Sequence, residues 1–427
     1  MTYYILFIIS ILSIPLYFYY KNFLDKGETI CIFIAAITHI SISMIDPGFS
    51  PILSSIVDSQ YYFNSALWFI ESNQWNTAFD TGAVFYSALL AIIFKITTPD
   101  ILLSNLSSTF FSILTCILFA RFLKLLNIQK TNSLILLVLF SFFPATLIFG
   151  SITLREPLQL LTLMASLFYL IKIYRNNYMS LIEHIVFFIS IILLGLLHYA
   201  LMYVSGLILC IYIYQNILTH TFYSKTSILL SAFILFFITI NIISYSRYID
   251  NSNKTSGIRI SASAIEIDRV RLAEFVIDNV NLVKLMEKIN QYRIRAETDF
   301  IGNTNYYILF DTSTIFSSIK SFVQIYTTYI FKPYIYEIYN LSSFYAAAES
   351  FIRISLILLV LITLISKRRL TNYTLTLILV FFTISIMWSL GTFNFGQAVR
   401  HHILTNWMLI LLAGISIKEL KSNKEFI

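Results

Sequence analysis

Charged residues are scarce in this sequence: they make up 12% of the 427 positions, whereas hydrophobic residues make up 58%. So few charges cannot cover the surface of a water-soluble protein of this length, and that class is excluded. The mean hydropathy of +0.77 agrees with this, and the chain is long enough for many membrane spans of about 20 residues each. We therefore predict an all-α, polytopic membrane protein.

Cysteine, proline and glycine are also few, with three, seven and eleven residues. The cysteines, Cys31, Cys116 and Cys210, each fall inside an apolar run, which argues against a disulfide framework or a cysteine-based metal site. The sequence has no glycine-rich phosphate loop, no Cys or His spacing suited to zinc and no Gly-x-Ser-x-Gly nucleophile motif. We therefore expect no cofactor, no metal and no nucleic-acid partner.

Long apolar runs predict about eleven transmembrane helices. They lie at roughly 2–20, 28–45, 102–120, 132–149, 157–173, 182–197, 200–217, 226–246, 347–366, 372–390 and 402–418. Lysine and arginine concentrate in one set of short loops, whereas the opposite set holds only Arg155 and Arg400. By the positive-inside rule, the N-terminus is outside and the C-terminus inside.

These runs divide the chain into three regions. Residues 1–246 form an N-terminal transmembrane module that includes a first outer loop at 46–101, residues 247–345 form a long outer segment with amphipathic helices, and residues 346–427 are C-terminal transmembrane helices. The apolar run at 83–97 is predicted to be a short interfacial or re-entrant outer helix, because a full span there would turn the basic segment RFLKLLNIQK outward.

The first outer loop contains DSQYYFNSALWFIESNQWN, residues 58–76, which is rich in aromatics and lacks lysine and arginine. Tyr62, Ala66, Phe69 and Ile70 share one helical face, which predicts a helix lying in the membrane interface with its apolar side down. Asp58 stands near the start of this helix. As the last residue of a Ser-x-x-Asp pattern, Asp58 fits a helix-capping role. A catalytic role for its carboxylate is compatible with capping.

Arginine occurs at two predicted outer helix ends, Arg155 in SITLREP (151–157) and Arg400 in GTFNFGQAVRHH (391–402). The helix macrodipole opposes a cation at a helix N-terminus unless an anion lies nearby. Glu156 would supply that anion in a plain ion pair. A phosphate or pyrophosphate of a ligand would supply it equally well, because the guanidinium fork matches phosphate oxygens.

Other polar residues at the outer side are weaker candidates. The two neighbouring histidines of RHH point about 100° apart on a helix and do not form a metal-ligand pair. Interfacial anchoring explains tyrosine and lysine at membrane borders without any ligand. The remaining candidate binding residues are Tyr62, Glu156, His198, His401, Lys332 and Tyr334 and, in the long outer segment, Arg271, Arg293 and Arg295.

The order of features in residues 40–215 resembles the GT-C superfamily of membrane glycosyltransferases. The resemblance rests on Asp58-x-x-x-Tyr62-x-x-x-Ala66, on GAVFYSALLAIIFK, on ARFLKLL and on FPATLIFGSITLREPLQLLTLMASLFYL. It implies a polyprenyl-linked sugar donor and a catalytic base in the first outer loop, which would be Asp58, with Asp46 as the competing position. Many members carry two adjacent acids there, whereas Ser59 follows Asp58 here.

The back half, in YIFKPYIYEIY and NFGQAVRHHILTNW, is similar to Wzy-type O-antigen polymerases. This implies an enzyme of the bacterial inner membrane that polymerises undecaprenyl-pyrophosphate-linked oligosaccharide repeat units at the periplasmic face, with a chain-length regulator as a partner. Arg155 and Arg400 would bind the leaving pyrophosphate, and residues 247–345 would cover the acceptor cavity.

Two other functions stay open. One is a GT-C transferase that adds a single sugar from a polyprenyl-monophosphate donor. The other is a flippase or transporter for the same lipid-linked oligosaccharide. Only Pro15 and Pro144 lie inside predicted spans, which favours an enzyme over a transporter built from broken helices.

Overall fold

A computed structural model describes residues 2–49, 56–78, 82–176, 179–219, 286–338 (apart from 288, 292, 295–305 and 307), 341–366 and 370–424. This part of the chain is helical and contains no β-strand, as the sequence predicts. Seven of its helices are long and apolar enough to cross a membrane, and four shorter helices are also apolar. The described residues thus have the make-up of a helical membrane protein.

The helices are α1 (Thr2–Tyr20), α2 (Lys26–Phe49), α3 (Ile56–Ser72), η2 (Trp75–Thr77), α4 (Gly82–Ile96), α5 (Ile101–Leu125), α6 (Lys130–Ser141), α7 (Pro144–Phe149), α8 (Glu156–Asn176), α9 (Leu181–Leu197), α10 (Tyr199–Thr219), α14 (Ile315–Phe331), η3 (Ile335–Glu337), α15 (Leu341–Ser366), α16 (Asn372–Gly391) and α17 (Phe395–Lys424). Short connections join the helices from α1 to α10 and those from α14 to α17, and most of the residues between α10 and α14 lie outside the described part of the chain.

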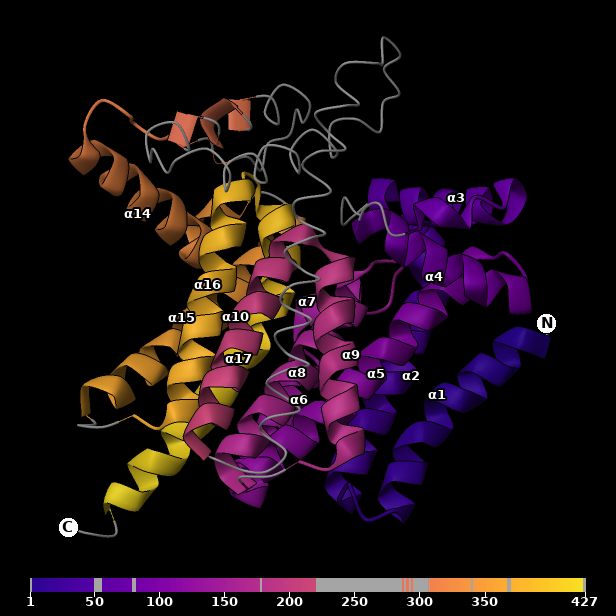
Figure 1. Ribbon diagram of the computed structural model, residues 1–427, viewed down its shortest axis with the longest axis horizontal. Coiled ribbons are helices and arrows are strands. Elements are labelled where there is room, and N and C mark those ends of the chain that lie inside the picture. Colours follow the sequence, from indigo (N-terminus) through magenta and orange to yellow (C-terminus); the bar gives the residue numbers. More distant parts are fainter. Residues whose placement is uncertain are drawn as a thin grey trace.

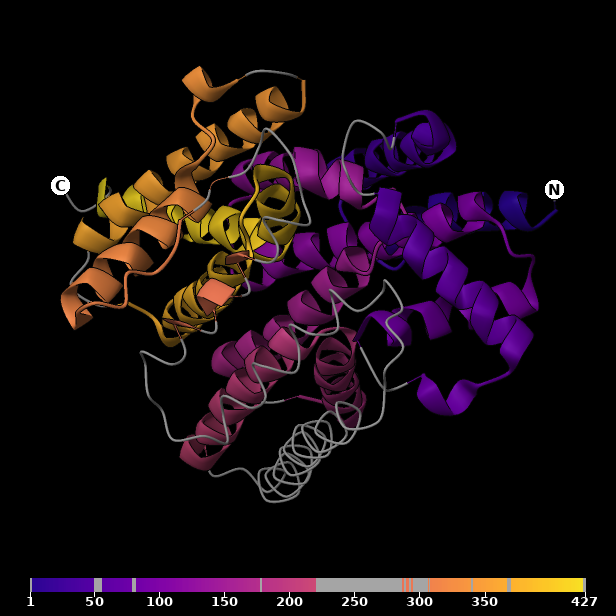
Figure 2. The ribbon, with the colours of Figure 1, turned by 90° about the horizontal axis from the view of Figure 1, so that it is seen from above.

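Most of these helices run along one common direction, and α3 lies across one end of the bundle (Figure 1). We call this end of the bundle the α3 end; the C-terminus lies at the opposite end. Seen from above, α3 and α4 lie on one side of the molecule and the C-terminal helices on the other (Figure 2).

The apolar run at 132–149 is not one helix. α6 ends at Ser141 and α7 begins at Pro144. Proline has no N–H to donate and restricts the residue before it, so the helix breaks there. The prediction of one continuous span in this region is therefore wrong. The run at 226–246 lies outside the described residues, and the count of eleven spans stays a prediction.

The short helix predicted at 83–97 corresponds to α4, which has 15 residues and is shorter than a typical span. It packs against α3 and α9. Nine of its residues, including Phe85, Tyr86 and Phe94, are buried. α4 is therefore a supporting element that holds α3 on the bundle, with little surface left for lipid.

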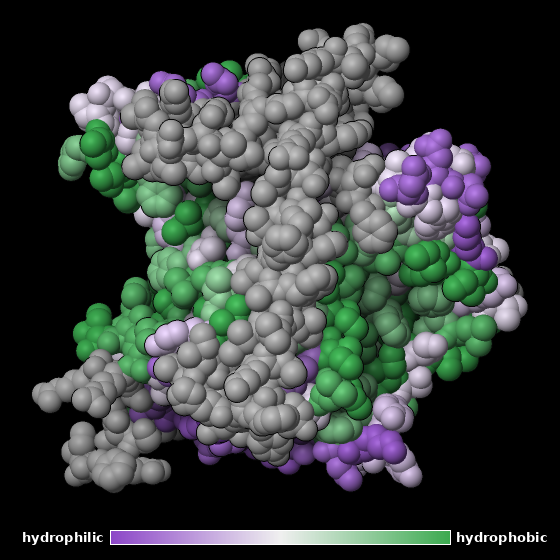
Figure 3. Space-filling view, in the orientation of Figure 1, coloured by the Kyte–Doolittle hydropathy of each residue, from purple (hydrophilic) through white to green (hydrophobic). Residues whose placement is uncertain are grey.

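A band of hydrophobic surface separates two hydrophilic ends on the face shown in Figure 3. Exposed Ile135, Ile185 and Leu358 belong to the apolar helices of this bundle. At the end opposite α3, Lys124 pairs with Glu28 at 2.7 Å. Exposed isoleucine and leucine side chains are stable in lipid, and charged pairs belong at the aqueous borders. The bundle therefore presents the surface of a membrane-embedded protein.

Candidate functional site

Helix α3 brings Asp58 to the bundle. Tyr62, Ala66 and Phe69 share the face that the sequence predicts, and they are 3%, 0% and 0% exposed. The Tyr62 and Tyr86 rings meet edge to face at 5.1 Å, so this face packs on α4. The expectation that it lies down on lipid is therefore wrong. Packing on protein fixes the direction in which the first turn of α3 presents Asp58.

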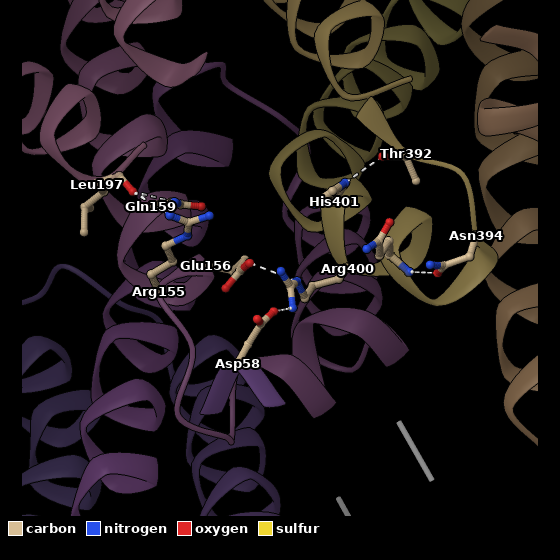
Figure 4. A network of polar contacts seen from close by, with 10 residues as sticks. Asp58, Arg155, Glu156, Gln159, Leu197, Thr392, Asn394, Arg400 and His401 are labelled. Atoms are coloured by element: carbon tan, nitrogen blue, oxygen red, sulfur yellow. Dashed lines mark hydrogen bonds and ion pairs between the residues drawn. The ribbon is translucent and has the colours of Figure 1, made fainter. Parts of the chain in front are cut away.

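Asp58, Glu156 and Arg400 form one group at the α3 end (Figure 4), which we call the ion-pair triad. Arg400 Nη1 pairs with Asp58 Oδ2, although the two residues are 342 positions apart. Arg400 Nε lies 3.0 Å from Glu156 Oε1. The side chains are 25% exposed for Asp58, 15% for Arg400 and 4% for Glu156. One guanidinium thus joins carboxylates from α3 and α8.

The environment of Asp58 holds its carboxylate in the ionised form. Burial alone would raise the pKa of Asp58, because it disfavours the charged form. The charge and hydrogen bond of Arg400, with smaller contributions from Arg155 and His401, outweigh burial and lower the pKa below its ordinary value. Asp58 is therefore charged at neutral pH and able to accept a proton.

Arg155 lies in the turn just before α8, and its side chain is 8% exposed. Its Nη1 donates to the Leu197 carbonyl at 3.4 Å, and Gln159 donates to the same oxygen at 3.2 Å. The buried Nε of Arg155 has no hydrogen-bond partner in the described part of the chain. Among the described residues no carboxylate lies within ion-pair distance of Arg155, since Glu156 pairs with Arg400 instead. Arg155 is thus a buried cation whose Nε–H donates no hydrogen bond to any described residue.

Helix α5 carries a polar stripe that holds the turn containing Arg155. Asn105 Oδ1 accepts from Thr153 N at 2.8 Å and from Thr153 Oγ1 at 2.6 Å. Ser112 Oγ donates to the Gly150 carbonyl at 3.0 Å. Sequence reasoning missed this stripe, although Asn105, Ser108 and Ser112 recur at helical spacing within an apolar run, which was a usable signal.

Helix α2 holds the same turn from another side. Ser43 Oγ donates to the Ser151 carbonyl at 2.8 Å, and His39 Nδ1 lies 2.8 Å from Ser151 Oγ. A Cβ on Gly150 would lie 2.2 Å from the Thr146 carbonyl oxygen, which is closer than atoms can approach. Glycine is therefore required where this turn is packed most tightly. The turn before α8 is fixed by α2 and α5 together.

His401 and His198 meet through a third ring, which sequence reasoning did not single out. The His401 ring stacks on Trp388, with centroids 4.5 Å apart and planes 17° apart. The His198 ring meets the same tryptophan edge on at 4.6 Å. His401 Nδ1 is 2.8 Å from Thr392 Oγ1. The two candidate histidines thus belong to one aromatic stack beside Arg400.

Arg293 is fully buried and donates to backbone carbonyls. Its guanidinium reaches the carbonyl oxygens of Ile308 at 2.8 Å, Leu390 at 3.2 Å and Thr392 at 3.0 Å. The last carbonyls of a helix lack partners within the helix, and a cation there is favoured by the macrodipole. Arg293 therefore fixes the turn between α16 and α17, which presents His401 and Arg400.

Among the described residues, Lys332 and Tyr334 do not join the triad. Lys332 Nζ pairs with Glu337 Oε1 at 2.5 Å and lies 5.7 Å from the centre of the Tyr334 ring, so these residues form a local cluster around η3. Asp46 belongs to α2, but its side chain lies outside what the structure describes. Arg271 and Arg295 lie outside the described residues.

Arg400 lies in the second turn of α17, because that helix begins at Phe395. The sequence placed Arg400 at the helix end, where the macrodipole acts; that influence falls off after the first turn. The cation is stabilised instead by the carboxylates of Asp58 and Glu156. Within the described part of the chain, no group of three or more His, Cys, Asp or Glu residues is arranged to hold a metal ion.

Comparison of the chain with protein-family models, with curated proteins and with solved structures gave no match. The chemistry of the site therefore has to be argued from its own residues.

Proposed function

We propose that this chain is a GT-C-like glycosyltransferase that polymerises undecaprenyl-pyrophosphate-linked oligosaccharide repeat units at the periplasmic face of the bacterial inner membrane. One observation carries the proposal. An ionised carboxylate, Asp58, lies near two guanidinium groups at one end of a hydrophobic bundle, that of Arg155, which is buried, and that of Arg400, which is 15% exposed. A base next to two cations suits a reaction that removes a proton and releases a pyrophosphate.

In the proposed reaction, a hydroxyl oxygen of the acceptor sugar attacks the anomeric carbon of the donor. The new glycosidic C–O bond forms while the bond from that carbon to the pyrophosphate oxygen breaks. The hydroxyl proton passes to the Asp58 carboxylate, and the electron pair of the broken bond leaves with undecaprenyl pyrophosphate. General-base catalysis of this kind needs the carboxylate ionised, which the lowered pKa of Asp58 provides.

The leaving pyrophosphate carries negative charge, and Arg155 is the side chain best suited to receive it. It is buried, keeps an unpartnered donor and has no carboxylate partner among the described residues. Arg400 would contribute its charge from the other side. Fixed donors aimed at developing charge inside a water-poor site are among the largest contributions to catalysis.

The pairing of Arg400 with Asp58 also explains how the base becomes stronger when substrate is present. While Arg400 pairs with Asp58, the carboxylate is a weak base, because the cation favours its charged form. A bound pyrophosphate would also pair with the Arg400 guanidinium, and the electrostatic interaction between Arg400 and Asp58 would become weaker. The pKa of Asp58 would then rise toward the range in which a carboxylate takes up a proton more readily.

The test is an assay of the purified full chain in nanodiscs with a lipid-linked repeat unit and no nucleotide sugar. The proposal expects a ladder of polymer on a gel, and loss of the ladder in Asp58→Asn and Arg155→Ala. Glu71→Gln is the matched control, because Glu71 is an exposed carboxylate on the same helix α3. It should retain the full ladder. A ladder retained by Asp58→Asn would overturn the assignment of the base.

The same assay separates the single-sugar transferase. If polymer is absent and a polyprenyl-phosphate sugar gives one mass increment on a lipid-linked acceptor, the chain is a transferase of single sugars.

The transporter remains a second candidate because of one observation, the break between α6 and α7 at Pro144. Transporters commonly use such discontinuous helices to form their substrate sites. Here, however, the N-terminus of α7 is closed by this chain's own Glu349, which accepts from Ala145 N. Flipping of a fluorescent lipid-linked oligosaccharide in proteoliposomes, without polymer formation, would favour the transporter.

A further inference from the structure

A second set of polar side chains is buried away from the ion-pair triad, where α14, α15 and α17 meet. Glu349 and Arg353 on α15 are 0% and 1% exposed, and His402 on α17 and Tyr329 on α14 are both 0% exposed. Tyr306, which precedes α14, is 6% exposed. We call these five residues the α15–α17 polar cluster. Buried ionisable groups within a membrane-spanning helix are costly, so they call for an explanation.

The five side chains lie close to one another. The rings of Tyr329 and His402 have centroids 4.1 Å apart. Glu349 and Arg353 are one helical turn apart and therefore share a face of α15. Arg353 interacts electrostatically with Glu349, Tyr329 and Tyr306. One small region of the interior thus contains all five polar groups.

Part of each charged side chain is hydrogen-bonded within the protein. Glu349 Oε1 accepts from Ala145 N and, at 3.2 Å, from Tyr345 Oη. Arg353 Nε donates to the Ile330 carbonyl at 2.7 Å, and its Nη2 donates to Ser350 Oγ at 2.9 Å. These bonds orient the carboxylate and the guanidinium.

Each cluster residue has one polar atom with no hydrogen-bond partner among the residues that the structure describes. These buried atoms are Glu349 Oε2, Arg353 Nη1, His402 Nδ1, Tyr329 Oη and Tyr306 Oη. Asn406, one turn beyond His402 on the same face of α17, has both amide atoms unpartnered. Each buried polar atom without a partner costs folding free energy, and native proteins rarely contain several in one place.

Whether each of these atoms is a hydrogen-bond donor or an acceptor indicates which kind of ligand fits the cluster. His402 Nε2 lies 2.9 Å from the Tyr329 carbonyl oxygen, so it is Nε2 that carries the proton and, in the neutral ring, Nδ1 is an acceptor. Glu349 Oε2 is also an acceptor, Arg353 Nη1 is a donor, and the two tyrosine hydroxyls can be either. An anion would need donors alone, and a metal cation would need acceptors alone.

We propose that the α15–α17 polar cluster is a binding site for ordered water molecules. Water both donates and accepts, so it matches a mixed set of this kind, and buried waters typically make about three hydrogen bonds to otherwise unsatisfied groups. Several waters would bridge the cluster and solvate the Glu349 and Arg353 charges within the bundle. This site is separate from the ion-pair triad and does not depend on the proposed glycosyl transfer.

The sign of a stability change tests the proposal. In Tyr329→Phe and Tyr306→Phe only a hydroxyl is removed, so both variants should fold. If waters bind these hydroxyls, each variant loses hydrogen bonds, and its melting temperature in detergent falls by roughly 1–2 °C. If the cluster contains no water, each variant loses a buried hydroxyl that had no hydrogen-bond partner, and its melting temperature rises. Tyr336→Phe is the matched control, because Tyr336 is 78% exposed.

A second measurement detects the water directly. Radiolytic hydroxyl radicals form at bound water and oxidise neighbouring side chains even when these are buried. The proposal expects oxidation of Tyr329 in the intact full chain, at a level well above that of Phe69, which is equally buried but packs on apolar rings. A melting temperature that rises in Tyr329→Phe, or a Tyr329 as unreactive as Phe69, would overturn the proposal.

Discussion

Arg400 is the residue on which the candidate site depends most, because it is the cation shared by Asp58 and Glu156. Glu156 is almost fully buried, and a buried carboxylate is stable only while its charge is compensated. The sequence contains adjacent Arg155 and Glu156, which suggested a local pair. In the structure Glu156 pairs with Arg400 on another helix, and among the described residues Arg155 has no carboxylate partner.

Removing Arg400 should destabilise the fold. Arg400→Ala leaves two carboxylates without their cation, and breaking a buried ion pair in this way costs about 3–5 kcal/mol. Thermal unfolding in detergent measures the loss. Lys320→Ala on α14, where the lysine is exposed, should unfold like the wild type. Adding Glu156→Gln to Arg400→Ala should recover part of the loss, and an unchanged Arg400→Ala would contradict the role of the triad.

The lowered pKa of Asp58 predicts how stability depends on pH. Because folding depresses this pKa below its ordinary value of 3.8, the ionised carboxylate stabilises the folded state. That contribution is complete above the ordinary value and is lost as the pH falls below it through the folded pKa. Melting temperatures measured from pH 7 down to about pH 3 should therefore fall less steeply at the acid end in Asp58→Asn than in the wild type.

The control for this pH series is Glu71→Gln, which changes an exposed carboxylate of the same helix and should keep the wild-type profile. If Asp58→Asn follows the wild-type curve down to the lowest pH, Asp58 does not have a depressed pKa in the folded protein.

At the scale of elements, the turn before α8 is held by polar residues inside apolar helices. Ser43 on α2 and Asn105 on α5 both bond to this turn, and both are fully buried. Hydrogen bonds of this kind in a membrane bundle fix the position of one helix against another. The site therefore depends on residues that do not themselves contact Arg400.

Two serines of α2 offer a matched pair to test this support. Ser43 Oγ bonds across to Ser151 and Thr109, whereas Ser41 Oγ is exposed and bonds only to the Ile37 carbonyl of its own helix. We expect Ser43→Ala to lose about 1–2 kcal/mol of stability and part of the polymerase activity. Ser41→Ala should match the wild type in both assays. Equal behaviour of the two variants would show that the turn is held by other contacts.

At the scale of the whole molecule, the proposed orientation places the α3 end on the periplasmic side. In a chain with Cys31, Cys116 and Cys210 replaced by alanine, single cysteines at Gln74 and Lys21 report on the two ends, since both positions are exposed. Gln74→Cys should react with a membrane-impermeant maleimide in intact cells. Lys21→Cys should react only after the cells are permeabilised. The reverse pattern would invert the topology and remove the periplasmic site.

A helical membrane protein and the positions of most described helices could be predicted from the sequence alone. Apolar runs of spanning length can be read directly, because lipid demands a continuous apolar surface and internally paired backbone groups. Pro144 also carried a local signal for the break between α6 and α7, since proline interrupts a helix wherever it stands. These features depend on neighbouring residues alone.

Which charged side chains pair with one another depends on the packing of the helices and could not be predicted from the sequence. Asp58 and Arg400 are 342 positions apart, and no periodicity in the sequence relates them. Likewise, the stacking of His401 on Trp388 and the burial of Arg293 against the end of α16 depend on how the helices pack. Apolar patterning fixes which segments are helices, but the partner of a charged side chain is set by packing between helices distant in sequence.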